Sequence, residues 1–166
     1  MHDKTLLMTL YKKLNDGQMA KDVFYKMLVR ALVDEVAGTR TSIWFFSSSL
    51  KDILSCESMY DKATNQWSSG LAFKEDDCSA YFEELTQSKQ VIAGDAHSDP
   101  ATSCFNDLEF SPVDPYGILD VLIEVDGESY GMVRGERGGG IGWNTDDLVY
   151  FKQVAAMIGL VLKKVG

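Results

Sequence analysis

The chain has 166 residues, of which 45% are hydrophobic, 16 are Lys or Arg and 25 are Asp or Glu. A domain of about 150 residues buries roughly 68–70% of its unfolded surface. This length therefore predicts one domain, 1–166, that needs no disulfide or metal ion to stabilise it. Residues 71–126 carry thirteen acids against Lys74 and Lys89, and the net charge of the chain is −9. Because such a surface repels phosphate, neither nucleic acid nor anionic membrane is an expected partner.

The three cysteines, Cys56, Cys78 and Cys104, are widely spaced and form no C-x-x-C pair. This pattern predicts neither a disulfide framework nor a zinc ribbon, and it fits a reducing cytosol. The apolar stretch near the N-terminus is too short for a secretory signal, and no window approaches the ~18 apolar residues of a membrane span. We therefore expect a cytoplasmic protein.

The N-terminal part, 1–36, predicts two helices, because its apolar residues recur every three or four positions on either side of Gly17. Residues 40–49 are rich in β-branched and aromatic side chains and predict a strand. A second strand is expected over 53–60, and 67–73 is a candidate for a third.

A short helix is expected over 78–87, with acidic and serine N-cap candidates before it, and a brief strand over 90–93. Residues 96–117 contain all three prolines and show no sustained period. Unpatterned segments of this length are often lids or binding loops, so we expect the site there.

Residues 118–125 alternate between apolar side chains and polar ones, with Asp120 and Glu124 on the polar face. This alternation predicts a half-buried antiparallel strand. Asp126-Gly127 is a strong hairpin signal, and 129–134 is the expected partner strand.

Residues 134–143 are rich in glycine but lack the spacing of a phosphate-binding loop, so we interpret them as a flexible connection. A helix is predicted over 144–165, with Asn144 or Thr145 as N-cap. Its apolar seam consists of Leu148, Phe151, Ala155, Ile158, Leu162 and Val165. Long helices bracketing an antiparallel sheet can bury their stripes only on the sheet or on each other, which predicts an α+β fold.

The alternating residues Asp95, His97 and Asp99 admit three interpretations: structural caps, ligand recognition by hydrogen bonding, or metal binding. Caps are favoured, because one His beside two carboxylates is common in ordinary loops. His2 lies at a terminus expected to fray, so any His-dependent catalysis would depend on His97. Cys104 has no basic neighbour in the sequence to lower its pKa, and we interpret it as inert.

Five segments together resemble a GAF domain, the small-molecule sensory fold of cyclic-nucleotide phosphodiesterases, phytochromes and many bacterial signalling proteins. The segments are SIWFFSSS (42–49), DDCSAYFEEL (76–85), VIAGDAHSDP (91–100), GILDVLIEVDGESYGMVRGERGG (117–139) and WNTDDLVYF (143–151). The resemblance covers roughly three quarters of the chain.

The resemblance implies a central antiparallel sheet of five or six strands with the terminal helices packed on one face. On the other face, the helix at 78–87 and the loop at 96–117 would cover a pocket. It also implies a homodimer through the terminal helices, although the apolar seam would be equally satisfied by packing on the sheet.

Three functional subclasses of the family are not matched by this sequence. The N-K…D signature of the cyclic-nucleotide binders is missing, and Cys104 is followed by Phe105 rather than by the His usual at bilin attachment sites. The grouped cysteines of the free methionine-(R)-sulfoxide reductases are also absent.

The sequence therefore predicts a non-enzymatic sensory domain that binds an unidentified small molecule, and it names no cofactor. The acidic surroundings favour a neutral or cationic ligand over a phosphate-rich one. Alternatives are a methionine sulfoxide reductase-type enzyme and a dimerisation module with a collapsed pocket. The predicted pocket residues are Trp44, Tyr60, Tyr81, Asp95, His97, Phe105, Tyr116 and Asp120.

Overall fold

The computed structural model describes residues 1–165, with four α-helices, two short 3-10 helices and an antiparallel sheet of seven strands. The helices are α1 (Thr5–Asn15), α2 (Lys21–Glu35), α3 (Ser79–Ser88) and α4 (Thr145–Val165), and the 3-10 helices are η1 (Glu75–Asp77) and η2 (Ser103–Asp107). The strands are β1 (Arg40–Phe46), β2 (Ile53–Asp61), β3 (Gln66–Ser68), β4 (Ala72–Lys74), β5 (Gln90–Ala93), β6 (Tyr116–Val125) and β7 (Glu128–Gly138). Along the sheet the order is β3-β2-β1-β7-β6-β5, and β4 pairs with β2.

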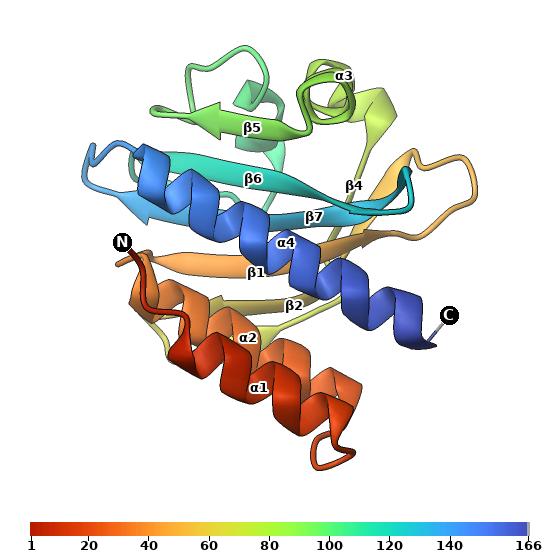
Figure 1. The fold of residues 1–166 in the computed structure, drawn as a ribbon. Helices are drawn as coiled ribbons and strands as arrows, with labels where there is room; N and C mark the ends of the chain where they lie inside the picture. Colours follow the sequence, from red (N-terminus) through yellow and green to blue (C-terminus); the bar gives the residue numbers. More distant parts are fainter. Residues whose placement is uncertain (166) are drawn as a thin grey trace.

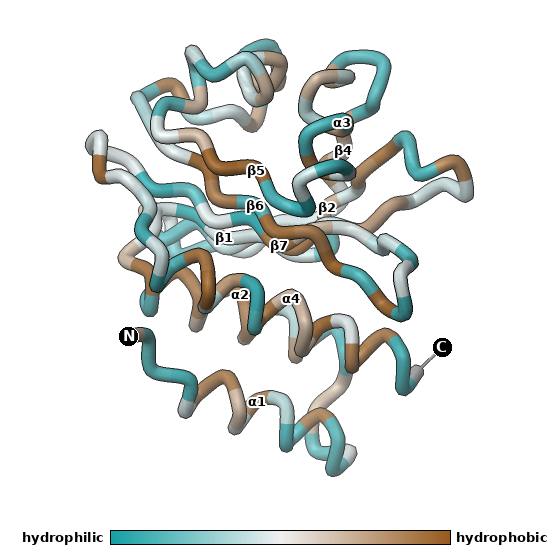
Figure 2. The backbone as a smooth tube through the Cα atoms, turned by 45° about the horizontal axis from the view of Figure 1, so that its top comes forward, coloured by the Kyte–Doolittle hydropathy of each residue, from teal (hydrophilic) through white to brown (hydrophobic). Residues whose placement is uncertain are grey.

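The sheet separates two layers (Figure 1). Helices α2 and α4 cover one face, with α1 packed beside α2, while α3 and the loop that contains η2 lie over the other face. The same division is visible in Figure 2, where brown apolar segments of β6 and β7 run between the layers. The α+β class and the two-sided arrangement predicted from the sequence are confirmed.

The apolar seam of α4 packs on the sheet. Phe151, Ala155 and Ile158 are buried in the core shared with α1 and α2, and Leu148 and Leu162 pack against that core. The side chain of Val165 lies outside the described residues. The seam is therefore satisfied within the domain, as its alternative interpretation allowed.

The glycine-rich run is partly a strand, which corrects the prediction of a flexible connection over 134–143. Strand β7 continues to Gly138, where it still pairs with Tyr116 of β6. A Cβ on Gly135 would lie 2.8 Å from the ring of Phe151, and one on Gly131 would collide with the carbonyl oxygen of Trp44. These two glycines leave room for close packing rather than providing flexibility.

The segment 67–73 is also not one strand. It forms β3 and β4, separated by Gly70 in the left-handed region at φ 83°. The predicted hairpin is confirmed, with Asp126 at φ 52° and Gly127 at φ 84°. A β-bulge interrupts its register between Ile123 and Glu124.

Strand β6 is buried on both faces along most of its length, whereas the alternation predicted a half-buried strand. The polar residue Asp120 is fully buried because the layer of α3 and η2 covers that face. Helix α4 begins as predicted. The Asn144 side chain accepts a hydrogen bond from the Asp147 amide at 2.9 Å, and the Asp147 carboxylate accepts one from the Asn144 amide at 3.1 Å. No helix among residues 1–165 is long and apolar enough to cross a membrane.

His2 is anchored rather than frayed, contrary to expectation. Its Nδ1 lies 2.7 Å from Glu35 Oε2 and its Nε2 lies 2.7 Å from Asp147 Oδ1. Burial works against the charged ring, but the hydrogen bonds and charges of the two carboxylates outweigh it and raise the pKa of His2. The imidazolium thus ties the start of the chain to α2 and α4.

This bridge predicts a pH-dependent contribution to stability. Because the folded pKa of His2 is raised, the contribution is complete below its ordinary value of 6.5 and is lost as pH rises through the folded value. We expect His2→Asn to lower the unfolding free energy by about 1 kcal/mol at pH 5.5 and by less at pH 9, measured by urea unfolding. An equal loss at both pH values would contradict the ionic bridge.

Candidate functional site

The face of the sheet under α3 carries an aromatic cluster. Trp44 comes from β1, Phe73 from β4, Tyr81 from α3 and Phe105 from η2, and all four are at most 2% exposed. The ring centroids of Phe73 and Tyr81 each lie 4.9 Å from that of Phe105, in edge-to-face arrangements. Four separate elements therefore meet at one point.

The guanidinium of Arg134 lies among these rings. Its central carbon is 4.5 Å from the ring centroid of Phe105 and 5.6–5.8 Å from those of Tyr81, Phe73 and Trp44. This is a cation–π environment on several sides, and Arg134 is only 3% exposed. The aromatic cluster is therefore built around a cation supplied by the protein.

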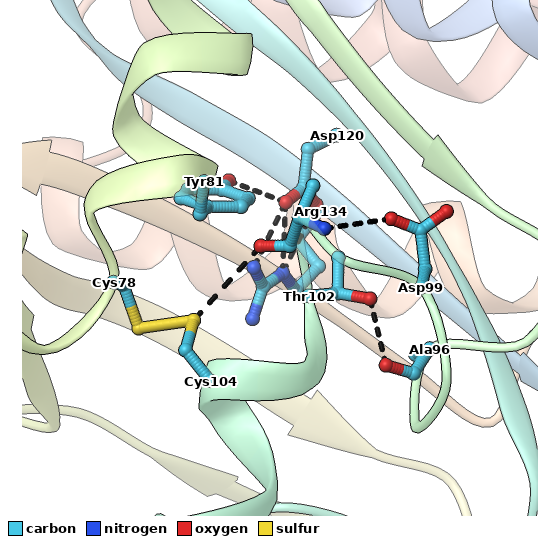
Figure 3. The surroundings of a disulfide bond; sticks show 9 residues. Cys78, Tyr81, Ala96, Asp99, Thr102, Cys104, Asp120 and Arg134 are labelled. Atoms are coloured by element: carbon cyan, nitrogen blue, oxygen red, sulfur yellow. Dashed lines mark hydrogen bonds and ion pairs between the residues drawn. A yellow bond between two sulfur atoms is a disulfide. The ribbon is translucent and has the colours of Figure 1, made fainter.

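Asp120 neutralises this cation in a bidentate ion pair (Figure 3). Arg134 Nε donates to Asp120 Oδ1 at 3.0 Å and Nη2 donates to Oδ2 at 2.8 Å. The Tyr81 hydroxyl donates to Oδ2 at 2.5 Å. We call Tyr81, Asp120 and Arg134, with the rings of Trp44, Phe73 and Phe105, the Arg134 cluster.

Burial dominates the electrostatics of the Arg134 cluster. It raises the pKa of Tyr81 well above 10, and the neighbouring Asp120 carboxylate raises it further, so the phenol stays a hydrogen-bond donor. Desolvation alone would lower the pKa of Arg134, but the charge of Asp120 outweighs it and raises that pKa. The guanidinium therefore stays charged and the phenol stays neutral across the physiological pH range.

A disulfide joins Cys78 and Cys104, with their Cα atoms 5.4 Å apart (Figure 3). This corrects two expectations: the cysteines were predicted to form no disulfide, and Cys104 to be an isolated inert thiol. They lie 26 positions apart in sequence, and only the placement of α3 beside η2 brings them together. Cys56 is free and buried, and burial raises its pKa to about 12.

Four of the eight predicted pocket residues, Trp44, Tyr81, Phe105 and Asp120, come together in the Arg134 cluster. Tyr60 does not, because it packs with the core on the helix-covered face and its ring lies 4.8 Å from Trp67. Sequence reasoning missed Arg134, Phe73 and the pairing of Cys78 with Cys104.

The remaining three predicted residues lie toward the edge of this face. Tyr116 is buried, and its ring meets the ring of His97 edge-on at 5.2 Å. The His97 Nε2 contacts the Pro112 carbonyl oxygen at 2.8 Å. Asp95 accepts hydrogen bonds from the His97 amide and the Ser98 hydroxyl, and Asp99 accepts one from the Ala101 amide. Asp95 and Asp99 therefore act as turn caps in this structure.

Side chains fill the space where the sequence predicts a pocket, since Arg134 occupies its centre. An open groove of about 460 Å³ borders this region at the ends of β1 and β7, and Arg40, Phe110 and Tyr116 contribute to its walls. Arg40 Nη1 donates to the Phe110 carbonyl at 2.8 Å and pairs with Glu136. The loop that contains Phe110 is thus bound to β1 beside the groove.

No protein-family model matches the chain, and no curated protein matches its sequence. The phycocyanobilin-bound GAF domain from a cyanobacterial phytochrome has a similar structure, with a TM-score of 0.77 over 99% of this chain and 95% of that one, at 13% identity. The chain has the GAF fold. The GAF domain from an Acinetobacter phosphoenolpyruvate-protein phosphotransferase covers the same shares of both chains with a TM-score of 0.73 at 11% identity. A methyl-accepting chemotaxis protein aligns with a TM-score of 0.72 over 94% of this chain and 96% of that one, at 15% identity. At these identities the likeness establishes the GAF fold alone.

The buried ion pair predicts strong coupling between its two members. Removing one partner leaves an unpaired buried charge, so we expect Asp120→Leu and Arg134→Met each to cost about 3–5 kcal/mol of unfolding free energy. The double variant should lose much less than the sum, because both charges leave together. Denaturant unfolding of the four proteins gives the coupling, and the double variant remains informative if a single variant does not fold.

A matched control is the exposed pair of Lys51 and Glu128, whose side chains are 39% and 67% exposed. The same cycle there should give little coupling, because solvent screens the charges. Additive losses at Asp120 and Arg134 would show that the buried pair is not an energetic unit.

Proposed function

We propose that this chain is a non-enzymatic sensory domain that binds a small molecule between the sheet and its cover, meaning α3 together with residues 96–115. The supporting observation is the Arg134 cluster. A buried ion pair is often no more stabilising than apolar residues of the same size, so charge kept inside an aromatic core suggests a role beyond stability.

The ligand class follows from what the cluster already holds. Four rings surround a flat cation, and Asp120 supplies its counter-charge. A ligand that replaces the Arg134 side chain among the rings should also carry a positive charge that the rings and Asp120 can accept, which favours a compact organic cation. The acids of 71–126 point the same way, since they disfavour phosphate-rich molecules.

The signal would come from a change of population. In the closed arrangement Arg134 fills the centre of the cluster, so a ligand can bind there only if the side chain leaves and the cover shifts. A ligand that binds the open arrangement alone increases its share by its differential affinity. The movement of the cover would transmit the signal by changing the surface that a downstream partner contacts.

A thermal-shift series tests the ligand class. We expect methylguanidinium or tetramethylammonium to raise the Tm by about 3–5 °C at ten times the Kd, whereas phosphate and AMP should not. Asp120→Asn should abolish the shift, because the counter-charge is lost. Asp107→Asn, an exposed acid on the cover, is the matched control and should keep it. Stabilisation by phosphates but not by cations would overturn the assignment.

The disulfide favours one alternative, a reductase of the methionine sulfoxide type. In such a reaction the Cys104 thiolate attacks the sulfoxide sulfur, the sulfide leaves while the oxygen is transferred to Cys104 as a sulfenic acid, and Cys78 then attacks the Cys104 sulfur and expels water. The balance is one sulfoxide and two thiols giving one sulfide, one disulfide and water. The observed Cys78–Cys104 bond would be the oxidised end of that cycle.

Thiol counting distinguishes the two functions. Reduced protein is treated anaerobically with methionine sulfoxide and then alkylated. Because we propose a non-enzymatic domain, we expect three alkylated cysteines before and after treatment. Loss of two, with Cys56 still alkylated and no loss in Cys104→Ser, would establish the reductase.

Three further expectations accompany this function as predictions. One is homodimerisation through the terminal helices, where Leu6, Met8 and Leu160 remain exposed. The others are a bacterial signalling context and a cytoplasmic location. The last now needs the disulfide to be transient, because cytosolic disulfides are usually catalytic or redox-sensing.

A further inference from the structure

We propose that Cys78 and Cys104 form a reversible thiol–disulfide site that controls whether the cover can open over the Arg134 cluster. This inference rests on the proposed function, since it concerns access to the same site. Figure 3 shows the disulfide beside the cluster, with Cys78 at the start of α3 and Cys104 in η2.

The disulfide joins the two halves of the cover, α3 and residues 96–115, through a covalent bond. Among residues 1–165, no hydrogen bond or ion pair joins α3 to residues 96–115. The bonds that shape the loop are mostly its own, such as Thr102 Oγ1 to the Ala96 carbonyl at 2.7 Å and Asn106 Nδ2 to the His97 carbonyl at 2.9 Å. What remains between the halves is apolar contact, chiefly Phe105 on Tyr81.

Phe105 connects the disulfide to the Arg134 cluster. It follows Cys104 directly, and its ring is the one nearest to the Arg134 guanidinium, at 4.5 Å. While the disulfide holds Cys104 against α3, Phe105 cannot move far from the cation. Without that bond, η2 can separate from α3 by breaking apolar contacts only, and the Arg134 cluster becomes reachable.

The two sulfurs differ in accessibility in a way that suits exchange with a small thiol. Cys78 is 1% exposed, whereas Cys104 is partly exposed. An external thiolate therefore attacks Cys104 Sγ, the S–S bond breaks, and Cys78 leaves as a thiolate that is then protonated. Cys78 immediately precedes α3, and the positive end of the helix dipole favours that thiolate.

The redox balance needs two co-reactants of defined class. A second thiol resolves the mixed disulfide on Cys104, so two thiols become one external disulfide while the protein gains two thiols. In the reverse direction a hydroperoxide oxidises Cys104 to a sulfenic acid and releases an alcohol or water. Cys78 then attacks that sulfur and expels water, which restores the bond.

Hydrogen exchange of the full chain tests the gate. We expect at least tenfold faster exchange in residues 100–108 after reduction with dithiothreitol, and in Cys78→Ser/Cys104→Ser without reductant. Amides of β6 and β7 should be unchanged, and Cys56→Ser should behave as the wild type. Unchanged exchange at 100–108, or equal acceleration in every element, would overturn the gate.

Ligand binding separates this proposal from the one it rests on. With tetramethylammonium as the probe, we expect at least tenfold weaker binding to the oxidised protein than to the reduced one. Equal affinity in both states would refute the redox gate and leave the cation site standing. Faster exchange at 100–108 with no binding in either state would refute the cation site and leave the redox-sensitive cover standing.

Discussion

The ion pair between Asp120 and Arg134 organises the covered face of the GAF fold. Asp120 accepts the Tyr81 hydroxyl and thereby fixes α3, while the Arg134 guanidinium lies against rings from β1, β4 and η2. A buried charge must be paired, so the closed arrangement depends on this charge pairing as well as on the fit of the side chains. On the opposite face the helices meet the sheet largely through apolar side chains, and the ion pair of Arg137 with Asp147 joins β7 to the first turn of α4.

Sequence periodicity indicated most of the helices and strands, and the family resemblance implied their division into two layers and placed Trp44, Tyr81, Phe105 and Asp120 at one site. Neither could supply Arg134, because its place in the site depends on strand register. A two-residue turn at 126–127 with regular pairing would set Asp120 opposite Val133, whose side chain lies on the helix-covered face. The bulge after Ile123 shifts the register by one, and Arg134 becomes the partner.

Tyr60 was misplaced for the same physical reason. Leu54 and Cys56 face the cover, and regular alternation along β2 would put Tyr60 on that side too. A second irregularity, at Ile43 and Trp44 of β1, leaves one β2 residue without a partner, so beyond it the alternation is reversed. Met59 then faces the cover and Tyr60 faces α2. Bulges leave little trace in hydrophobic patterns, and here two of them decide which side chains reach the site.

The closed cluster also sets how tightly any ligand can bind. If the binding-competent arrangement is a small fraction of the population, the apparent affinity falls by that fraction even when the contacts are ideal. Everything that holds the cover down therefore weakens binding without touching the ligand, including the bond from Arg40 to the Phe110 carbonyl and the disulfide. Noncovalent contacts shift this fraction continuously, whereas a disulfide changes it in one chemical step. A cover whose two halves are joined to each other by one covalent link and otherwise by apolar contact is thus suited to respond to two inputs, a ligand and a redox state, through one equilibrium.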